Sequence, residues 1–263
     1  MRHSLSPVIM NTAFAEMGLD WVYVAFQVGA SGGAGALRAI EALGIQGCSV
    51  TMPLKQEIAD ALDRLDPLAQ ALRAVNCVYR DGDGLAGANT DGAGFCAALA
   101  EAGVAVEGSR VGLLGAGGAA RSVIAGLGSA GVSDVVVVNR SAERAEAAAA
   151  LSPVARVGQA TDLGAVDIVV NATSVGMGDG ALPCDPAALT DGQVVVDLVY
   201  HPIETPLLAE ARRRGLSVVD GVGMLVHQAA LAVRLWTGRP APVAAMNAAA
   251  RQALAVSADG EIA

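Results

Sequence analysis

Lysine is nearly absent from the sequence: Lys55 is the only lysine, and the other 16 of the 17 basic residues are arginines. Acidic residues outnumber basic ones, which gives a net charge of -9 at pH 7. The arginines form no long basic run, so charge and composition argue against a nucleic-acid partner. Charged residues are few, at 16%, whereas hydrophobic residues make up 53% of the 263 positions. This balance excludes a disordered chain and supplies ample material for a core.

Metal-ligand patterns and membrane signals are lacking as well. The four cysteines form no CxxC pair and the three histidines are scattered, which argues against a zinc site. Reduced thiols in a cytoplasmic protein are the simplest interpretation. The stretch "MRHSLSPVIMNTAF" has no apolar signal core. The most apolar later stretch, "GMLVHQAALAVRLW", carries His227, Gln228 and Arg234 and is too short to cross a bilayer.

Short apolar runs alternate with helical patterns along the whole chain. Strands are predicted at residues 21–28, 47–51, 110–115, 134–139, 166–172, 193–199 and 216–221, with a hairpin over 76–89. Helices are predicted at 34–44, 53–65, 92–103, 119–131, 141–151, 205–215, 223–236 and 241–256. The Val-rich strands of the second half are typical of parallel strands that are buried on both faces. This alternation predicts an α/β fold.

A glycine-rich turn follows the first of the strong strands. The stretch "RVGLLGAGGAARSVI" places Gly115, Ala116, Gly117, Gly118 and Ala119 between a predicted strand and a predicted helix. This G-x-G-x-x-A pattern is a form of the dinucleotide-binding fingerprint. Glycines let the backbone approach a pyrophosphate, and the helix N-terminus supplies N–H donors and a positive dipole. A purely structural turn is the alternative, but the strand before it and the helix after it favour a nucleotide site.

The end of the next predicted strand indicates which nucleotide binds. NAD sites usually have Asp or Glu here, which bonds the ribose 2′-OH. This chain has Asn139 and Arg140, followed by Ser141 and Arg144. An arginine fork matches a 2′-phosphate, which a carboxylate would repel. We therefore predict NADP as the cofactor, with a solvated helix position as the alternative for Arg144.

Polar side chains gather at predicted element ends in the first part of the chain. They are Ser4, Ser6, Thr51, Lys55, Asn76, Asn89, Thr90 and Asp91. Ligand groups tend to meet such ends, although each residue alone could be a helix cap or a turn residue. A partly buried lysine can lose its proton whereas arginine cannot, so Lys55 is a candidate proton-transfer group. The alternative is a lysine on a solvated helix face.

In this order the motifs resemble shikimate dehydrogenase over nearly the whole chain. The resemblance is carried by "HSLSP", "SVTMPLK", "AVN", "GANTDGAGF", "GAGGAAR", "NRSAER", "NATSVGM", "DLVYHPIETPLL" and "DGVGMLVHQAALA". It implies an N-terminal α/β substrate domain and a Rossmann-type doubly wound NADP-binding domain, with a cleft between them. It also implies reversible reduction of 3-dehydroshikimate to shikimate by NADPH, within aromatic amino-acid biosynthesis.

The resemblance also assigns roles to individual residues. It implies Lys55 and Asp91 as the catalytic pair, in which Lys55 donates a proton to the developing oxyanion and Asp91 orients it. The implied substrate-binding residues, beside this pair, are Ser4, Ser6, Thr51, Asn76, Tyr200 and Gln228. The implied cofactor residues are Gly115, Ala116, Gly117, Gly118, Ala119, Asn139, Arg140, Ser141 and Arg144, with Thr173, Leu198, Gly221 and Met224 toward the nicotinamide.

Two features depart from the family pattern. The family has a strand ending in "G-x-P-I" before "HS", which this sequence does not show, so we expect a first sheet that is one strand short. Met10 stands where histidine is common in the family, and Leu198 where methionine is common. Three other functions stay open: a quinate dehydrogenase, an aminoshikimate dehydrogenase, and a non-catalytic NADP-binding protein on the same fold.

These considerations predict the domain organisation and the partners. We expect a substrate-binding domain over residues 1–92 and a Rossmann domain with linker helices at its ends over 93–237. We expect the C-terminal helices of 238–263 to pack back onto the first domain. The expected partner is shikimate or 3-dehydroshikimate, with no metal, nucleic acid or membrane. The expected state is a monomer or homodimer in the cytoplasm.

Overall fold

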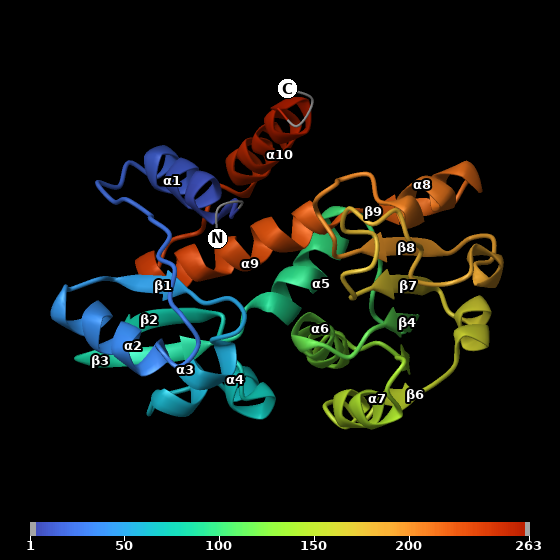
Figure 1. Ribbon diagram of the computed structural model, residues 1–263, viewed down its shortest axis with the longest axis horizontal. Coiled ribbons are helices and arrows are strands. Elements are labelled where there is room, and N and C mark those ends of the chain that lie inside the picture. The colour runs from blue at the N-terminus through green and yellow to red at the C-terminus, as the bar shows by residue number, and fades with distance from the viewer. Residues whose placement is uncertain (1–3, 261–263) are drawn as a thin grey trace. The chain divides into compact units, whose positions relative to one another are not determined.

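The structure, a computed structural model, describes residues 4–260, with side chains through residue 256. It divides into two compact units (Figure 1). The first unit comprises residues 1–91 and 228–250, and the second comprises 92–227 and 251–263. Each unit has a β-sheet of its own.

The first unit is built on a three-stranded antiparallel sheet in the order β1-β2-β3. Its strands are β1 (Gly47–Ser49), β2 (Cys77–Asp81) and β3 (Gly84–Ala88). The predicted hairpin is confirmed, because β2 and β3 pair directly and Gly82 occupies the left-handed region at their turn, with φ +59°. The hairpin places Asn76 directly before β2.

The described part of the unit also contains four short helices. They are α1 (Ser6–Glu16), α2 (Gly33–Ala42), α3 (Lys55–Ala61) and α4 (Pro67–Leu72). Of these, α2, α3 and α4 share an apolar cluster with the sheet. Leu37 and Ile40 of α2 and Ile58 of α3 are buried in one apolar cluster with Val78 and Leu85 of the sheet. Burial of this cluster fixes α3 against the sheet, and α3 begins at Lys55.

The prediction of a strand at 21–28 is wrong. These residues are without regular structure, and no described strand pairs with them. The backbone of Tyr23 is instead bonded by a side chain: its N–H donates to Asn11 Oδ1 and its carbonyl accepts from Asn11 Nδ2. Val22 and Phe26 are consequently exposed, at 76% and 63%. The apolar pattern is present, but a strand requires a partner strand.

The second unit contains a six-stranded parallel sheet in the order β6-β5-β4-β7-β8-β9. Its strands are β4 (Arg110–Leu114), β5 (Asp134–Val138), β6 (Ala155–Val157), β7 (Ile168–Asn171), β8 (Val194–Asp197) and β9 (Ser217–Val219). This is the doubly wound Rossmann order, in which the chain reverses its direction of travel between β4 and β7. Ligands bind at such a switch point, beyond the carboxyl ends of the strands.

Both faces of this sheet are covered. The helices of the unit are α5 (Asp91–Glu101), α6 (Gly118–Ser129), α7 (Ala142–Ala149), α8 (Pro206–Arg213) and two short 3-10 helices, η1 (Ala160–Ala165) and η2 (Pro186–Ala188). Residues of α5, α6 and α7 share one core with Leu113 and Val170 of the sheet. Residues of α8 and both 3-10 helices share the other core with Leu114 and Val169. The Val-rich strands are therefore buried on both sides, as predicted.

Two long helices, α9 (Gly221–Thr237) and α10 (Val243–Gly260), complete the chain. Each contributes residues to both units, because the unit boundaries fall inside them at 227/228 and 250/251. Neither they nor any other helix in the described part of the chain combines the length and hydropathy that crossing a bilayer requires.

Candidate functional site

Lys55 and Asp91 form an ion pair in the first unit. Lys55 is the first residue of α3 and Asp91 is the first residue of α5. The Lys55 Nζ lies 2.6 Å from Asp91 Oδ2. The side chain of Asp91 is 10% exposed and that of Lys55 is 23% exposed. The pair is thus shielded by protein and still open to solvent or a ligand.

Asn76 holds the carboxylate of this pair from the other side. Its Nδ2 donates to Asp91 Oδ1 at 2.7 Å and to Thr90 Oγ1 at 2.9 Å. Its Oδ1 accepts from the Thr90 N–H at 2.8 Å. Thr90 Oγ1 in turn donates to the carbonyl of Gln228 at 3.1 Å. Asn76, Thr90 and Asp91 are all buried, so satisfied hydrogen bonds fix the carboxylate in one orientation.

This arrangement leaves donors available on the lysine. Asp91 uses one oxygen for Lys55 and the other for Asn76. Among the described residues, Asp91 is the only hydrogen-bond partner of the Lys55 amine. An ammonium carries three N–H donors, so two of them can reach a ligand. The pair can therefore donate a proton to a substrate oxygen and keep its own geometry.

The other predicted substrate residues of the first unit lie at element ends. Ser6 is the first residue of α1, and its N–H donates to Ser4 Oγ at 3.3 Å. Both serines are half-buried. Thr51 is exposed two residues beyond β1. Gln228 lies within α9, where its Oε1 is 3.4 Å from Asn76 Nδ2. The structure thus connects Gln228 with the Lys55–Asp91 network, whereas the side chains of Ser4 and Ser6 make no hydrogen bond to that network among the described residues.

The predicted glycine turn lies between β4 and α6 in the second unit. Gly115 has φ +111°, and a side chain there would lie 3.0 Å from Thr173 Cγ2 and 3.1 Å from the Ala172 carbonyl. Only glycine suits this position. Gly117 and Gly118 face open space, since a Cβ on either would meet no atom within 4 Å. Their open faces leave room for a phosphate to approach the backbone.

The N-terminus of α6 is free to bind an anion. Its N-cap residue is Gly117, which has no side chain to bond the first N–H groups of the helix. Residues 117–119 are exposed. Free N–H groups and the positive end of a 12-residue helix together favour a pyrophosphate. The chemistry of the turn therefore fits a dinucleotide.

A second group of residues at the same edge of the sheet is suited to bind a separate phosphate group. Asn139, Arg140, Ser141 and Arg144 line a shallow cavity of about 370 Å³ after β5. Ser141 caps α7 by accepting from the Arg144 N–H, and Asn139 Nδ2 donates to the Ser141 carbonyl. Arg140 and Arg144 are exposed and form no ion pair within residues 4–260. Two uncommitted guanidinium groups suit a ribose 2′-phosphate.

The remaining predicted cofactor residues lie at the carboxyl ends of β7 and β8. Thr173 follows β7, and Leu198 and Tyr200 follow β8. Gly221 begins α9 against them: a Cβ there would lie 2.4 Å from the Leu198 carbonyl. Met224, one turn further along α9, packs beside the core of the unit. Burial raises the pKa of the Tyr200 phenol, which therefore stays a neutral hydroxyl that can donate a hydrogen bond.

Sequence reasoning gave no role to two groups of buried polar residues. Thr90, which the sequence places only among the polar side chains at predicted element ends, links Asn76 to Gln228. Asn171 and Asp197, both fully buried, bond each other at the ends of adjacent strands. The available signal was a polar residue that closes a continuous apolar run, in "IVVN" and "VVVD".

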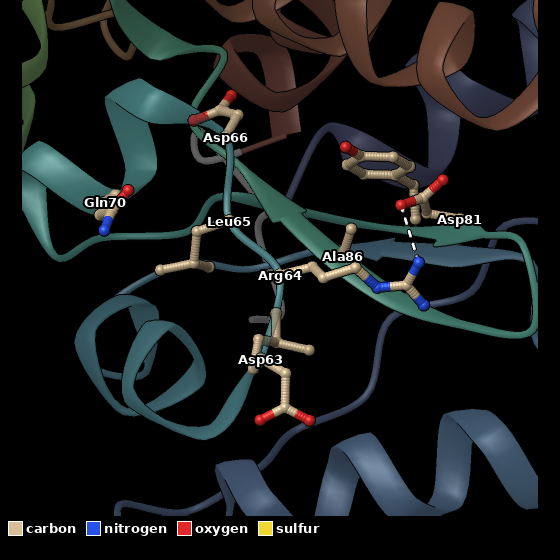
Figure 2. Close-up of a pocket in the computed structure, with 9 residues that line it drawn as sticks. Asp63, Arg64, Leu65, Asp66, Gln70, Asp81 and Ala86 are labelled. Carbon is tan, nitrogen blue, oxygen red and sulfur yellow. Dashed lines mark hydrogen bonds and ion pairs between the residues drawn. The ribbon is translucent and has the colours of Figure 1, made fainter.

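A larger cavity in the first unit, of about 580 Å³, lies apart from these groups (Figure 2). It is lined by Leu62, Asp63, Arg64, Leu65, Asp66, Gln70, Tyr79, Asp81 and Ala86. Arg64 and Asp81 pair at 3.0 Å across it, and Asp66 is used as the N-cap of α4. None of the predicted site residues lines this cavity. Across residues 4–260, no group of three or more His, Cys, Asp and Glu side chains is arranged to hold a metal ion.

Comparison with known proteins connects both units to one family. Residues 1–78 match the family model "Shikimate dehydrogenase substrate binding domain", residues 98–176 match "Shikimate / quinate 5-dehydrogenase", and residues 221–251 match "Shikimate 5'-dehydrogenase C-terminal domain". The chain is 45% identical to the shikimate dehydrogenase (NADP(+)) of Moorella thermoacetica, over 99% of this chain and 92% of that protein.

Solved structures agree. The crystal structure of shikimate 5-dehydrogenase from Thermus thermophilus in complex with NADP(H) and shikimate matches with a TM-score of 0.91 at 38% identity, covering 96% of each chain. Quinate dehydrogenase from Corynebacterium glutamicum in complex with NAD matches with a TM-score of 0.87 at 32% identity, covering 94% of each chain. The fold is thus shared by enzymes that differ in substrate and cofactor.

Proposed function

The chain belongs to the shikimate dehydrogenase family, and on this premise we propose how its residues carry out the reaction. The reaction is the reversible, NADP-dependent reduction of 3-dehydroshikimate to shikimate. The observation that carries the proposal is the 2.6 Å ion pair between Lys55 and Asp91, in which the lysine amine has no other protein partner among the described residues.

In the direction of reduction, NADPH bound by the second unit would supply the hydride that the ketone carbon receives. Lys55 donates a proton to the ketone oxygen and stabilises the negative charge that develops there. Asp91 keeps the ammonium in place through Oδ2, and Asn76 keeps Asp91 in place through Oδ1. In the reverse direction, Lys55 accepts the proton of the substrate hydroxyl. Asp91 and Gln228 also bond substrate hydroxyls, together with Thr51.

The carboxylate of the substrate is bound by hydroxyl groups. Ser4, Ser6 and Tyr200 supply these donors, and neutral donors suffice to fix a carboxylate. The half-buried serines and the neutral Tyr200 phenol are donors of this kind. This choice of donors is the basis for preferring shikimate over quinate, which carries an additional hydroxyl group.

The cofactor is bound by the second unit. The turn from Gly115 to Ala119 and the N-terminus of α6 hold the pyrophosphate, which the open faces of Gly117 and Gly118 permit. Arg140 and Arg144 hold the 2′-phosphate, with Asn139 and Ser141 beside them. Thr173, Leu198, Gly221 and Met224 surround the nicotinamide end.

In this assignment the two domains bind different ligands. Residues 1–92, together with Tyr200 and Gln228, bind the substrate, and the rest of 93–237 binds the cofactor. Of the helices of 238–263, expected to pack back onto the first domain, residues up to 250 belong to the first unit, whereas those from 251 on belong to the second. The division of the chain into two compact units supports the boundary near residue 92.

We also propose that the protein acts in the cytoplasm as a monomer or homodimer, without nucleic acid. Four free cysteines and a net charge of -9 support this.

Steady-state kinetics with two substrates and two cofactors test the proposal. The absorbance of reduced nicotinamide is followed with shikimate or quinate, each with NADP+ or NAD+. We expect the highest kcat/KM for shikimate with NADP+. A preference for quinate with NAD+ would assign the chain to the related activity of the Corynebacterium enzyme. Tight NADP+ binding without turnover of either substrate would instead indicate a non-catalytic binding protein.

A further inference from the structure

The two strands that flank the proposed nicotinamide end finish on buried polar residues. Asn171 closes β7 and Asp197 closes β8, and the register of the parallel pair sets them opposite each other. Both are 0% exposed. Asn171 Nδ2 donates to Asp197 Oδ1 at 2.9 Å. A carboxylate without solvent contact is costly to keep ionised unless hydrogen bonds compensate it, so its bonds define what it does.

Asp197 fixes the segment after its own strand. Its Oδ1 also accepts from the Val199 N–H at 3.0 Å. Its Oδ2 accepts from Thr205 Oγ1 at 2.7 Å. Thr205 is itself the N-cap of α8, where its Oγ1 accepts from the Leu208 N–H. One carboxylate thus anchors both ends of the segment 198–205, which carries Leu198 and Tyr200.

Asn171 fixes the segment after β7 in the same way. Its Oδ1 accepts from the Thr173 N–H at 3.1 Å and from Thr173 Oγ1 at 2.7 Å. Its Nδ2 donates to the Val175 carbonyl at 3.1 Å as well as to Asp197. The orientation of this carboxamide therefore depends on the acceptor that Asp197 supplies. A change at Asp197 would reach Thr173 through Asn171.

Burial raises the pKa of the Asp197 carboxyl, and the bonds from Thr205, Val199 and Asn171 oppose that rise.

The neighbouring strands show that the sheet does not need a polar residue at this level. β4 ends on Leu114 and β5 on Val138, both apolar. The polar pair occurs where β7 and β8 lead into the two segments that carry proposed cofactor residues.

We propose that Asp197 is a positioning residue, which acts through Asn171 and Thr205 to hold the segments 172–175 and 198–205 in the shape that the nicotinamide end of the cofactor requires. The proposal rests on the proposed function, because the roles of Thr173 and Leu198 are part of it. Asp197 itself is fully buried and touches neither substrate nor cofactor.

A matched control lies at the other end of the same strand. Gln193 precedes β8, is 3% exposed, and donates through Nε2 to the carbonyls of Leu163 and Val166 at 2.6 Å and 2.9 Å. It is a buried polar residue with several hydrogen bonds, like Asp197, but it bonds neither cofactor segment. Gln193→Met should therefore reveal the cost of losing buried hydrogen bonds in this sheet without a positional effect.

The test compares Asp197→Asn with Gln193→Met by calorimetric titration with NADP+, by kinetics with shikimate and by thermal unfolding. For Asp197→Asn we expect NADP+ Kd to rise several-fold and kcat to fall about 10- to 100-fold, since misplacement by about 1 Å can cost on the order of 100-fold. The KM for shikimate should rise as well, because the segment 198–205 also carries Tyr200. For Gln193→Met we expect Tm to fall while Kd and kcat stay within about twofold of wild type.

Unchanged Kd and kcat in Asp197→Asn, with a fall in Tm like that of Gln193→Met, would reduce Asp197 to a structural role and overturn the proposal. If Asp197→Asn does not fold, Thr205→Val removes one of its three bonds, and Thr205→Ser restores the hydroxyl. We then expect loss in the first variant and recovery in the second. Because NADP+ Kd is measured without substrate, failure of wild-type shikimate turnover would refute the proposed function and leave the positioning test intact.

Discussion

Removal of the two arginines after β5 should lower the preference of the protein for NADP+ over NAD+. Arg140 and Arg144 border a cavity of about 370 Å³ and have no carboxylate partner within the described residues. A hydrogen bond between charged groups contributes about 1.5–3 kcal/mol, and exposed groups belong at the low end of this range. Each guanidinium is therefore expected to contribute about 1.5 kcal/mol toward a 2′-phosphate, or about tenfold in affinity.

The expected results follow directly. Arg140→Ala and Arg144→Ala should each weaken NADP+ binding about tenfold, and the double variant about 100-fold if the two act independently. The affinity for NAD+ should stay within about twofold, because NAD+ has no phosphate for the arginines to bind. Calorimetric titration with both dinucleotides measures the ratio of the two dissociation constants.

Arg38→Ala is the matched control. Arg38 is another exposed arginine, on α2 of the first unit, and its removal changes the net charge by the same amount. It should leave both affinities unchanged. A double variant that retains the wild-type ratio of NADP+ to NAD+ affinity would refute the reasoning, as would an equal loss of affinity for both dinucleotides.

Three further predictions concern the Lys55–Asp91 pair, the cysteine thiols and the stability of the protein at acid pH. Asp91→Asn removes the charge that holds Lys55 at 2.6 Å, so kcat should fall at least about 100-fold with NADP+ Kd unchanged; a loss confined to NADP+ binding would contradict this role. Burial raises the pKa of Cys48 to about 12 and that of Cys77 still further, so neither thiol should react with an aromatic disulfide reagent at pH 8 until the protein is unfolded; rapid labelling of either thiol in the native protein would be inconsistent with that burial. Hydrogen bonds from Arg110 hold the pKa of Asp167 below its usual range. The pair therefore stabilises the folded protein above the pKa of Asp167 in the unfolded chain, and this stabilisation is lost as the pH falls through the pKa of Asp167 in the folded protein. Arg110→Gln should make Tm fall less steeply at acid pH, and an unchanged slope would show that the pair contributes nothing.

Continuous apolar runs were sufficient to predict the second sheet. Runs such as "DVVVV" and "VVVD" are typical of strands that are buried on both faces. The structure confirms parallel strands between two helical layers. Residues 21–28 carry an equally apolar run, yet they form no strand in the described chain. The difference is pairing: apolar periodicity describes the side chains, whereas a strand also needs backbone partners, which lie elsewhere in the sequence.

The candidate site shows the same limit. Composition singles out Lys55 as the only lysine, and the resemblance to the shikimate dehydrogenase family pairs it with Asp91. The distance between them depends on how α3 and α5 meet, 36 positions apart, and no local pattern specifies it. The bonds of Thr90 and Asp197 likewise follow from strand register and the approach of α9. A buried polar residue at a strand end marks such a position, but its partner becomes evident only in the fold.

The central claim is that the Lys55 ammonium transfers the proton, and Lys55→Arg tests it most directly. The arginine keeps the positive charge, but its planar guanidinium neither gives up a proton readily nor fits the position of Nζ beside Asp91. The measurement is single-turnover oxidation of shikimate with NADP+ already bound, which separates chemistry from binding. We predict a rate at least about 100-fold below wild type with unchanged NADP+ affinity. A rate within twofold of wild type would contradict the account.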